Sequence, residues 1–376
     1  MAALNLLTLA IQQWNTLALL LAPGSLALCF WIYVKQFYGV SNQSKTSKKK
    51  DQKCDSFKSM GAIEPLTEFD WKTQEEERIY KFNPKYFLTM GLQNTDINWI
   101  THVDKQFAGR LSERQKILDT HPAALGYEPN AVPMVNELYE YLVQEYFPRR
   151  YPTIFKLTPA EKPTHILNTA NNDKLPLEVP DNPTEALRLL AVNIDEDFLM
   201  LLPSLDGDGY SLQSFVWCYP VGFSPADKLG LKLREAHKPV PAYKEKLQTS
   251  MDRYFNRLEP GKVVYRVNWA VATSSDLCVD GEYHLYEGQE VTDTKVDMQD
   301  CWIRCELQTL FALPKTGGRI LSVHLYLYPL QEIKDQGLGE QMIEAIQGLK
   351  EGNAPGFWRY KRAPVWQDQV TAFLRS

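Results

Sequence analysis

His237 is the residue whose surroundings most favour a chemical role, because it stands directly before Lys238-Pro239-Val240-Pro241. Two prolines stiffen the backbone that follows it, and a rigidly held imidazole suits a metal ion. An iron porphyrin requires one such axial ligand, an apolar slot and cationic groups for its propionates. Lys228, Arg234 and Arg266 are the candidate cations. The alternative is a loop histidine without a ligand.

A second group of polar side chains lies on two segments with the alternating pattern of β-strands. Side chains two residues apart share one face of a strand. Arg266 and Asn268 therefore share a face, and so do Arg304, Glu306 and Gln308. If the two strands are neighbours, these faces meet and form one side of a binding site. The alternative is a row of polar side chains that faces solvent.

Other histidines and acidic clusters are weaker candidates. We expect His324 to be a half-buried strand residue and His284 to lie in a polar turn. Asp195-Glu196-Asp197 and Asp206-Gly207-Asp208 resemble metal-binding triplets of glycosyltransferases, but such triplets are common in surface turns, and we expect turns. The sequence has no G-x-G-x-x-G or G-x-x-x-x-G-K-[ST] motif, so we expect any electrons to come from another protein.

The elements that must position these residues are those of an α+β fold. Apolar spacing predicts two helices between residues 104 and 147 and one continuous helix from Tyr243 to Leu258. Residues 189–202 are expected to form two short strands or one bent strand, and residues 148–183 a proline-rich connection. Further strands are predicted over Ser211–Cys218, Val263–Ala272, Ile303–Leu313 and Ile320–Tyr328. Two strands, helices and three strands is the order of a PAS-like sensor fold.

Composition sets the broad class of the protein. The 376 residues are 44% hydrophobic and 23% charged, which is ordinary for a globular chain. With 41 basic and 46 acidic residues the net charge is −5, and we expect no nucleic-acid partner. The six cysteines show no paired spacing, which favours a reducing compartment.

The first forty residues predict a membrane anchor. Thr16–Val34 is almost entirely apolar, and no charge precedes Lys35. A helix of about 19 residues rises roughly 28 Å, close to the thickness of the hydrocarbon core. Because lysines follow this segment and none precede it, the positive-inside rule places the large domain in the cytosol. The alternative is a cleaved signal peptide, which the missing basic start disfavours.

A set of short motifs occurs in a defined order between residues 80 and 330. It comprises Met90-Gly91-Leu92 with Trp99, Pro148-Arg149-Arg150-Tyr151-Pro152 with Phe155, Asp195–Pro203, Pro220-Val221-Gly222, Lys228–Gly230, His237–Pro241, Arg266-Val267-Asn268-Trp269, Arg304–Leu310 and Leu313–Gly317. In these motifs the chain resembles the haem-dependent oxidative N-demethylase alpha-subunit-like family, whose fungal members often carry an N-terminal membrane segment. The resemblance implies a PAS-like domain that binds haem b.

The family also implies an activity and roles for single residues. In bacterial members a small secondary amine is oxidatively demethylated with O₂ and electrons from a partner reductase, and formaldehyde is released. The resemblance makes His237 the proximal iron ligand. It makes Arg266, Asn268, Glu306 and Gln308 the lining of the haem or substrate side, with Glu306 holding the protonated amine.

The resemblance completes the expected organisation. We expect an α+β chain with a PAS-like antiparallel sheet, flanking helices and an N-terminal transmembrane helix. The expected parts are a membrane anchor (1–40), a flexible basic linker (41–62), an N-terminal helical part (63–150), a PAS-like haem domain (151–330) and a C-terminal helix and tail (331–376).

One departure from the family and two other functions stay open. The family usually has an arginine where Leu307 stands, but by strand alternation Leu307 faces away from Glu306 and Gln308. A non-catalytic haem or small-molecule sensor is the first alternative, because PAS-like folds mostly sense. A lumenal glycosyltransferase is the second, and it requires the opposite membrane topology.

Overall fold

The computed structural model describes residues 57–279, 283–291 and 295–376, which belong to one compact unit. The predicted anchor at 1–40 lies outside the described residues, as does most of the predicted linker at 41–62. Within the described ranges, every helix is too short or too polar to cross a bilayer.

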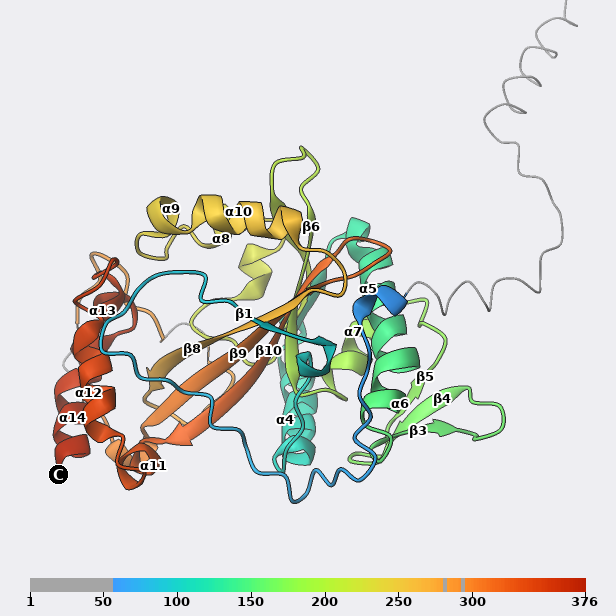
Figure 1. Ribbon diagram of the computed structural model, residues 1–376, viewed down its shortest axis with the longest axis horizontal. Coiled ribbons are helices and arrows are strands. Elements are labelled where there is room, and N and C mark those ends of the chain that lie inside the picture. Colours follow the sequence, from blue (N-terminus) through green and yellow to red (C-terminus); the bar gives the residue numbers. More distant parts are fainter. Residues whose placement is uncertain (1–56, 280–282, 292–294) are drawn as a thin grey trace, which may run out of the picture. The chain divides into compact units, whose positions relative to one another are not determined.

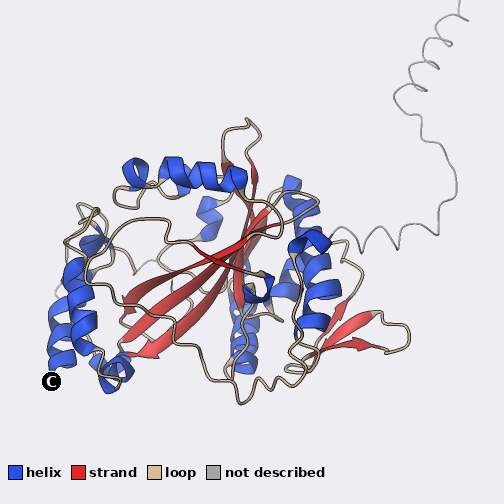
Figure 2. Ribbon diagram, viewed as in Figure 1, coloured by secondary structure: helices blue, strands red, loops and turns tan. Residues whose placement is uncertain are grey.

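A single antiparallel sheet organises the described part of the chain (Figures 1 and 2). Its seven strands follow the order β1-β8-β9-β10-β6-β7-β2. The three long strands predicted near the end of the chain are confirmed, and β8 has the predicted bounds. The strands are β1 (Gln93–Thr95), β2 (Leu125–Tyr127), β6 (Glu196–Pro203), β7 (Tyr210–Val216), β8 (Val263–Ala272), β9 (Trp302–Ala312) and β10 (Arg319–Pro329).

One face of the sheet is covered by short helices that follow β7. They are α8 (Leu233–Ala236), α9 (Tyr243–Lys246) and α10 (Gln248–Arg257), drawn above the strands in Figure 1. The prediction of one continuous helix from Tyr243 to Leu258 is wrong, because the backbone departs from helical geometry at Leu247, where φ is −117°. The predicted apolar stripe is nevertheless buried, since Tyr243, Leu247, Met251 and Phe255 all pack into the core against the sheet.

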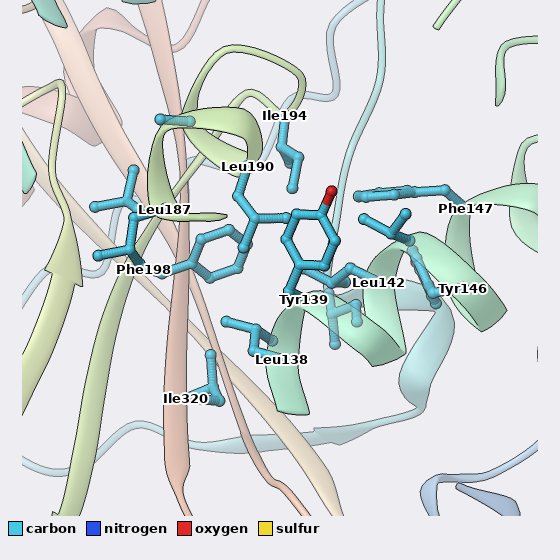
Figure 3. Packing of buried hydrophobic residues seen from close by; sticks show 14 of the residues in the cluster. Leu138, Tyr139, Leu142, Tyr146, Phe147, Leu187, Leu190, Ile194, Phe198 and Ile320 are labelled. Carbon is cyan, nitrogen blue, oxygen red and sulfur yellow. The ribbon is translucent and has the colours of Figure 1, made fainter. Parts of the chain in front are cut away.

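The opposite face of the sheet packs at one end against helices that precede β6. The two predicted helices are present, the second continuing through a π-helical turn. A further helix ends at Ala191, so residues 189–191 of the segment expected to be extended are helical, while Glu196–Pro203 form the strand β6. This part of the core joins Leu138 and Leu187 on helices to Phe198 and Ile320 on strands (Figure 3). The helices are α4 (Phe107–Thr120), α5 (Val132–Glu140), the π-helix η5 (Tyr141–Tyr146), α6 (Phe147–Arg150) and α7 (Pro183–Ala191).

The other end of that face packs against the C-terminal segment. We expected one helix and an irregular tail, but the segment is helical almost throughout. Trp366, Val370 and Leu374 recur at helical spacing and are buried against the sheet side chains Cys305 and Leu307. The helices are α11 (Leu330–Asp335), α12 (Gly339–Gly348), α13 (Phe357–Tyr360) and α14 (Ala363–Arg375).

Two features of the fold bear on the expected organisation. Residues 148–183 were expected to form a plain connection, but they contain a small antiparallel sheet of β3, β4 and β5. In addition, β1 and β2 come from the expected N-terminal helical part and pair with β8 and β7 of the large sheet. The three small strands are β3 (Phe155–Thr158), β4 (His165–Asn168) and β5 (Lys174–Pro176).

Candidate functional site

A cavity of about 300 Å³ lies between the large sheet and the short helices that cover it. Such a volume is at the lower end of the range for ligand pockets, and most of its wall is apolar, as such pockets are. Apolar side chains reach it from strands, from α8 to α10 and from α13. They include Leu199, Leu201, Leu212, Leu233, Val240, Met251, Phe255, Leu310 and Phe357.

The polar side chains predicted on two strands meet on the wall of this cavity. Arg266 lies directly opposite Gln308, and Asn268 directly opposite Glu306, across the β8–β9 pair. Oε2 of Glu306 accepts hydrogen bonds from Gln308 Nε2 at 2.8 Å and from Asn268 Nδ2 at 3.3 Å. Because all four side chains line the cavity and Glu306 is only 8% exposed, the alternative of a solvent-facing row is wrong.

Arg304 was grouped with this row but has a different role. Its guanidinium is buried and donates to the carbonyl oxygens of Tyr219 and Leu277, at 2.9 and 3.1 Å. It does not line the cavity. Leu307 is buried on the other face, within the core under the C-terminal helices, as strand alternation predicts. An arginine in its place would therefore point away from the cavity.

His237 ends α8 and lines the cavity. Its Nδ1 is 2.8 Å from the carbonyl oxygen of Leu233, and because a carbonyl only accepts, Nδ1 carries the proton. The ring stacks on Tyr243 at 4.9 Å between centroids, and burial lowers the pKa of His237. Among the described residues Nε2 has no hydrogen-bond partner, so the neutral ring keeps a free lone pair, the form that binds metals.

The three predicted cations separate into two groups. Lys228 and Arg266 line the cavity. Arg234 does not, because its guanidinium forms ion pairs with Asp208 at 2.7 Å and Asp252 at 3.5 Å. Arg266 forms no ion pair with any described residue, and its buried Nε has no hydrogen-bond partner there. A buried cation without a partner is unfavourable unless a ligand supplies the missing counter-charge and hydrogen-bond acceptors.

The sequence-based prediction missed one polar residue of the cavity wall, Lys361, and misplaced another, His284. Lys361, between α13 and α14, is 6% exposed, and its Nζ donates to Asn268 Oδ1 at 3.1 Å and to the carbonyl oxygen of Trp269. Burial lowers the pKa of Lys361 to about 8. His284, expected in a polar turn, stacks on Tyr360 with centroids 4.1 Å apart, and burial lowers its pKa to about 4. Lys361 was missed because no spacing pattern in the sequence distinguishes it from an exposed lysine.

The charges of the wall define what the cavity can hold. Among the described lining residues, the cations Lys228, Arg266 and Lys361 face one carboxylate, Glu306. The lowered pKa values of His237 and His284 keep both rings neutral near pH 7. A neutral imidazole, apolar walls and an excess of cations form a donor set that fits a porphyrin with two propionates.

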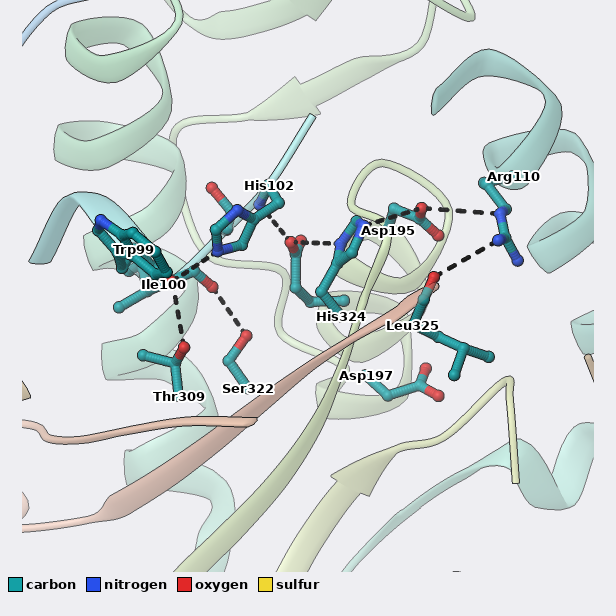
Figure 4. Close-up of polar contacts among 12 residues, drawn as sticks. Trp99, Ile100, His102, Arg110, Asp195, Asp197, Thr309, Ser322, His324 and Leu325 are labelled. Atoms are coloured by element: carbon teal, nitrogen blue, oxygen red, sulfur yellow. Dashed lines mark hydrogen bonds and ion pairs between the residues drawn. The ribbon is translucent and has the colours of Figure 1, made fainter. Parts of the chain in front are cut away.

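The first acidic triplet is not a surface turn, as we had predicted. Asp195, Glu196 and Asp197 are all buried beside α4, and we call them, with Arg110, Arg114 and His324, the α4 network. Figure 4 labels four of its members, Arg110, Asp195, Asp197 and His324. The buried charges of the network have partners of opposite sign, which makes burial tolerable.

Short contacts hold the α4 network together. Arg114 Nη1 lies 2.9 Å from Asp197 Oδ1, and Asp197 also accepts the backbone N–H groups of Cys218 and Tyr219, both at 2.8 Å. His324 Nδ1 lies 3.0 Å from Glu196 Oε1. His324 is 3% exposed, so it is fully buried rather than half-buried.

The second acidic triplet lies in an exposed turn between β6 and β7, as predicted. Asp206 and Asp208 are paired with Lys232, at 2.6 and 3.3 Å. In the part of the chain that the structure describes, no three His, Cys, Asp or Glu side chains are arranged to hold a metal ion. Neither triplet therefore forms the metal site that the glycosyltransferase interpretation requires.

A comparison with protein families agrees with the chemistry of the cavity. The model of the family described as haem-dependent oxidative N-demethylase, alpha subunit-like, matches residues 91–371. The match includes His237, the polar face of β8 and β9, and Lys361. Because it covers well over half of the 376 residues, the chain belongs to the haem-dependent oxidative N-demethylase, alpha subunit-like family.

Proposed function

We propose that this protein is a haem-dependent oxidative enzyme that removes a methyl group from a small amine. The observation that carries the proposal is the cavity wall, where the free Nε2 of His237 and an excess of cations meet in an otherwise apolar space. The family match supports haem-dependent chemistry of this kind. The order of two strands, helices and three strands supports a PAS-like domain built around haem b.

His237 would hold the iron through Nε2. The hydrogen bond from Nδ1 to Leu233 fixes the orientation of the ring, and the stacked ring of Tyr243 limits its rotation. Lys228 and Arg266 would pair with the propionates, since both are cations of the cavity wall without an ion-pair partner among the described residues. Arg234 is excluded from this role by its ion pairs with Asp208 and Asp252.

Glu306 would bind the amine. Its Oε2 is occupied by the amide donors of Asn268 and Gln308, whereas Oε1 has no hydrogen bond to a described residue. A carboxylate oxygen held in a largely apolar space binds an amine N–H strongly. The apolar side chains exclude water and leave room for N-methyl groups.

When bound, haem supplies the activation of O₂ that this chain's own side chains lack. In the overall reaction an N-methyl amine, O₂, two electrons and two protons give the demethylated amine, formaldehyde and water. The electrons would come from a partner reductase, because no nucleotide motif occurs in the sequence.

The test of the cofactor assignment is the absorbance spectrum of the full chain in mild detergent with added hemin. We expect an intense Soret band in the wild type and its loss in His237→Ala, because the iron loses its protein ligand. The matched control is His121→Ala, which removes an exposed histidine and should leave the band unchanged. A band that persists in His237→Ala with an unaltered maximum would rule out the ligand assignment.

A second measurement separates an enzyme from a haem sensor. With a chemical reductant and dimethylamine, the smallest secondary amine with an N-methyl group, an enzyme consumes O₂ and releases formaldehyde. Glu306→Gln should bind hemin but lose this activity, because the amide no longer offers a charged acceptor. A wild type that binds hemin but shows no amine-dependent O₂ uptake would favour the sensor.

We also propose that residues 1–40 anchor the protein in a membrane with the domain in the cytosol. The apolar segment Thr16–Val34 and the lysines that follow it support this topology. A glycosylation reporter at the C-terminus should stay unmodified, and its modification would reverse the orientation.

A further inference from the structure

Lys361 is the one buried lysine among the described residues, and its backbone is held from both sides. Its N–H donates to the carbonyl oxygen of Phe357 at 2.8 Å, which closes α13. Its own carbonyl oxygen accepts the indole N–H of the buried Trp366 at 3.1 Å. These contacts direct the side chain from the C-terminal helical layer into the wall of the cavity.

The ammonium group of Lys361 has no direct counter-ion among the described residues. It donates to Asn268 Oδ1 and to the carbonyl oxygen of Trp269, and it reaches Glu306 only through the amide of Asn268. A buried cation with neutral partners alone is costly, and replacing it with an apolar side chain would relieve that cost. The rings of Tyr86 and Trp269, with centroids 5.9 and 5.3 Å from Nζ, also lie near the ammonium but do not neutralise its charge.

We infer that the ammonium of Lys361 and a cationic amine compete for Glu306, the one carboxylate on the described wall of the cavity, so that amine binding expels one proton from the site. The inference rests on the proposed function, because it takes an amine as the ligand of Glu306. It adds Lys361 as a residue whose protonation state determines the pH range in which the amine binds. Lys361 is thus a positioning residue, acting on the ligand through shared electrostatics.

The groups that face Lys361 from the surrounding elements keep their charge between pH 6 and 9. Burial raises the pKa of Tyr86 to about 12 and that of the Cys305 thiol well above its usual value. His284 stays neutral because burial lowers its pKa to about 4. Arg266 on β8 also lines this wall.

Lys361 therefore changes charge where its neighbours do not. Desolvation lowers its pKa to about 8, and the cation Arg266 adds to this effect while Glu306 opposes it. An alkylamine in water, like lysine, stays protonated up to about pH 10. Below about pH 8 two cations would thus share one carboxylate, and the site must release a proton to bind the amine. Affinity for the amine then rises with pH, by up to about tenfold per unit below pH 8.

The test is a calorimetric titration of the hemin-loaded full chain with dimethylamine from pH 6 to 9, in buffers of different ionisation enthalpy. The wild type should release about one proton per amine at pH 7 and almost none at pH 9. Lys361→Met should bind about tenfold more tightly than the wild type at pH 7, without proton release or pH dependence. Lys361→Arg should bind weakly at every pH, because its charge cannot be lost.

Lys350→Met is the matched control, because it removes an exposed lysine from the same C-terminal layer and should retain the wild-type pH dependence. A wild type that binds without proton release, or that binds no amine with its Soret band intact, overturns the inference. So does a folded Lys361→Met with the wild-type profile. If Lys361→Met fails to fold, tight binding by Lys361→Arg overturns it. Absence of the Soret band, by contrast, refutes the proposed function.

Discussion

The cavity and the α4 network both bury charged side chains in one compact unit, but they differ in how the charges are balanced. In the network, Arg114 meets Asp197, and His324 meets Glu196, at distances of 2.9 and 3.0 Å. On the cavity wall, three cations share Glu306, and the Nε of Arg266 has no partner among the described residues. The charged groups of the network thus have partners of opposite sign, whereas Arg266 in the cavity has no ion pair with a described residue.

The difference has a physical reason. Buried charges are tolerated when opposite charges and hydrogen bonds replace the lost water, so a balanced set can be part of the core. An unbalanced set lowers the stability of the ligand-free fold and is retained where a ligand supplies the missing charge. Substitutions in the two regions should therefore have different effects on folding.

The largest effect is expected in the α4 network. Arg114→Met leaves Asp197 buried without its cation and also removes the hydrogen bonds to the carbonyl oxygens of Ala191 and Glu196. We expect a loss of about 3–5 kcal/mol in the free energy of unfolding, measured by urea denaturation. Arg375→Ala, which breaks an exposed pair with Glu340, should lose at most about 1 kcal/mol. Equal losses would contradict the distinction between the buried network and the surface.

A smaller effect should appear in the pH dependence of stability. Burial raises the pKa of Asp195 to about 7. Between about pH 4 and 7 the unfolded chain therefore releases this proton while the folded chain keeps it, and stability falls as pH rises. Asp195→Asn cannot titrate, so its stability relative to the wild type should increase by about 3 kcal/mol across this window. A constant difference in urea midpoints from pH 4 to 7 would show that Asp195 is charged when folded.

The smallest effect on folding is expected in the cavity. Arg266→Met removes a cation that has no ion pair among the described residues and that lies in the same wall as Lys361. We expect stability to stay within about 1 kcal/mol of the wild type, or to rise, while hemin binding weakens. Arg266→Lys serves as the control that keeps the charge. A loss of stability as large as that of Arg114→Met would remove the contrast between the two regions.

Much of the fold was predictable because strand and helix periodicities are local. The alternation in Val263–Ala272 gave β8 its bounds and put Arg266 and Asn268 on one face. The prediction of extended structure over residues 189–202 is confirmed for Glu196–Pro203, which form β6, but not for Leu189–Ala191, because so short an apolar run suits either a helix or a strand. It forms the end of α7, packed against α5.

Part of the site was also predictable, and the missing part has a clear cause. His237 could be identified because two prolines follow it, and Glu306 and Gln308 because strand alternation places them on one face. Lys361 did not, since it lies 93 positions from Asn268 in the sequence and touches it only in the fold. Asp195 was misplaced because an acidic triplet carries no sign of the arginines on α4 that neutralise it.

The sequence by itself determined the α+β class, the polar faces of β8 and β9 and the family, because these depend on residue type and short-range spacing. Tertiary structure alone decided which charges meet. It gathered Lys361, Arg266 and Glu306 from distant segments into one cavity and separated Arg234 from them. Burial then set the charge states, because desolvation depends on what surrounds a group in space.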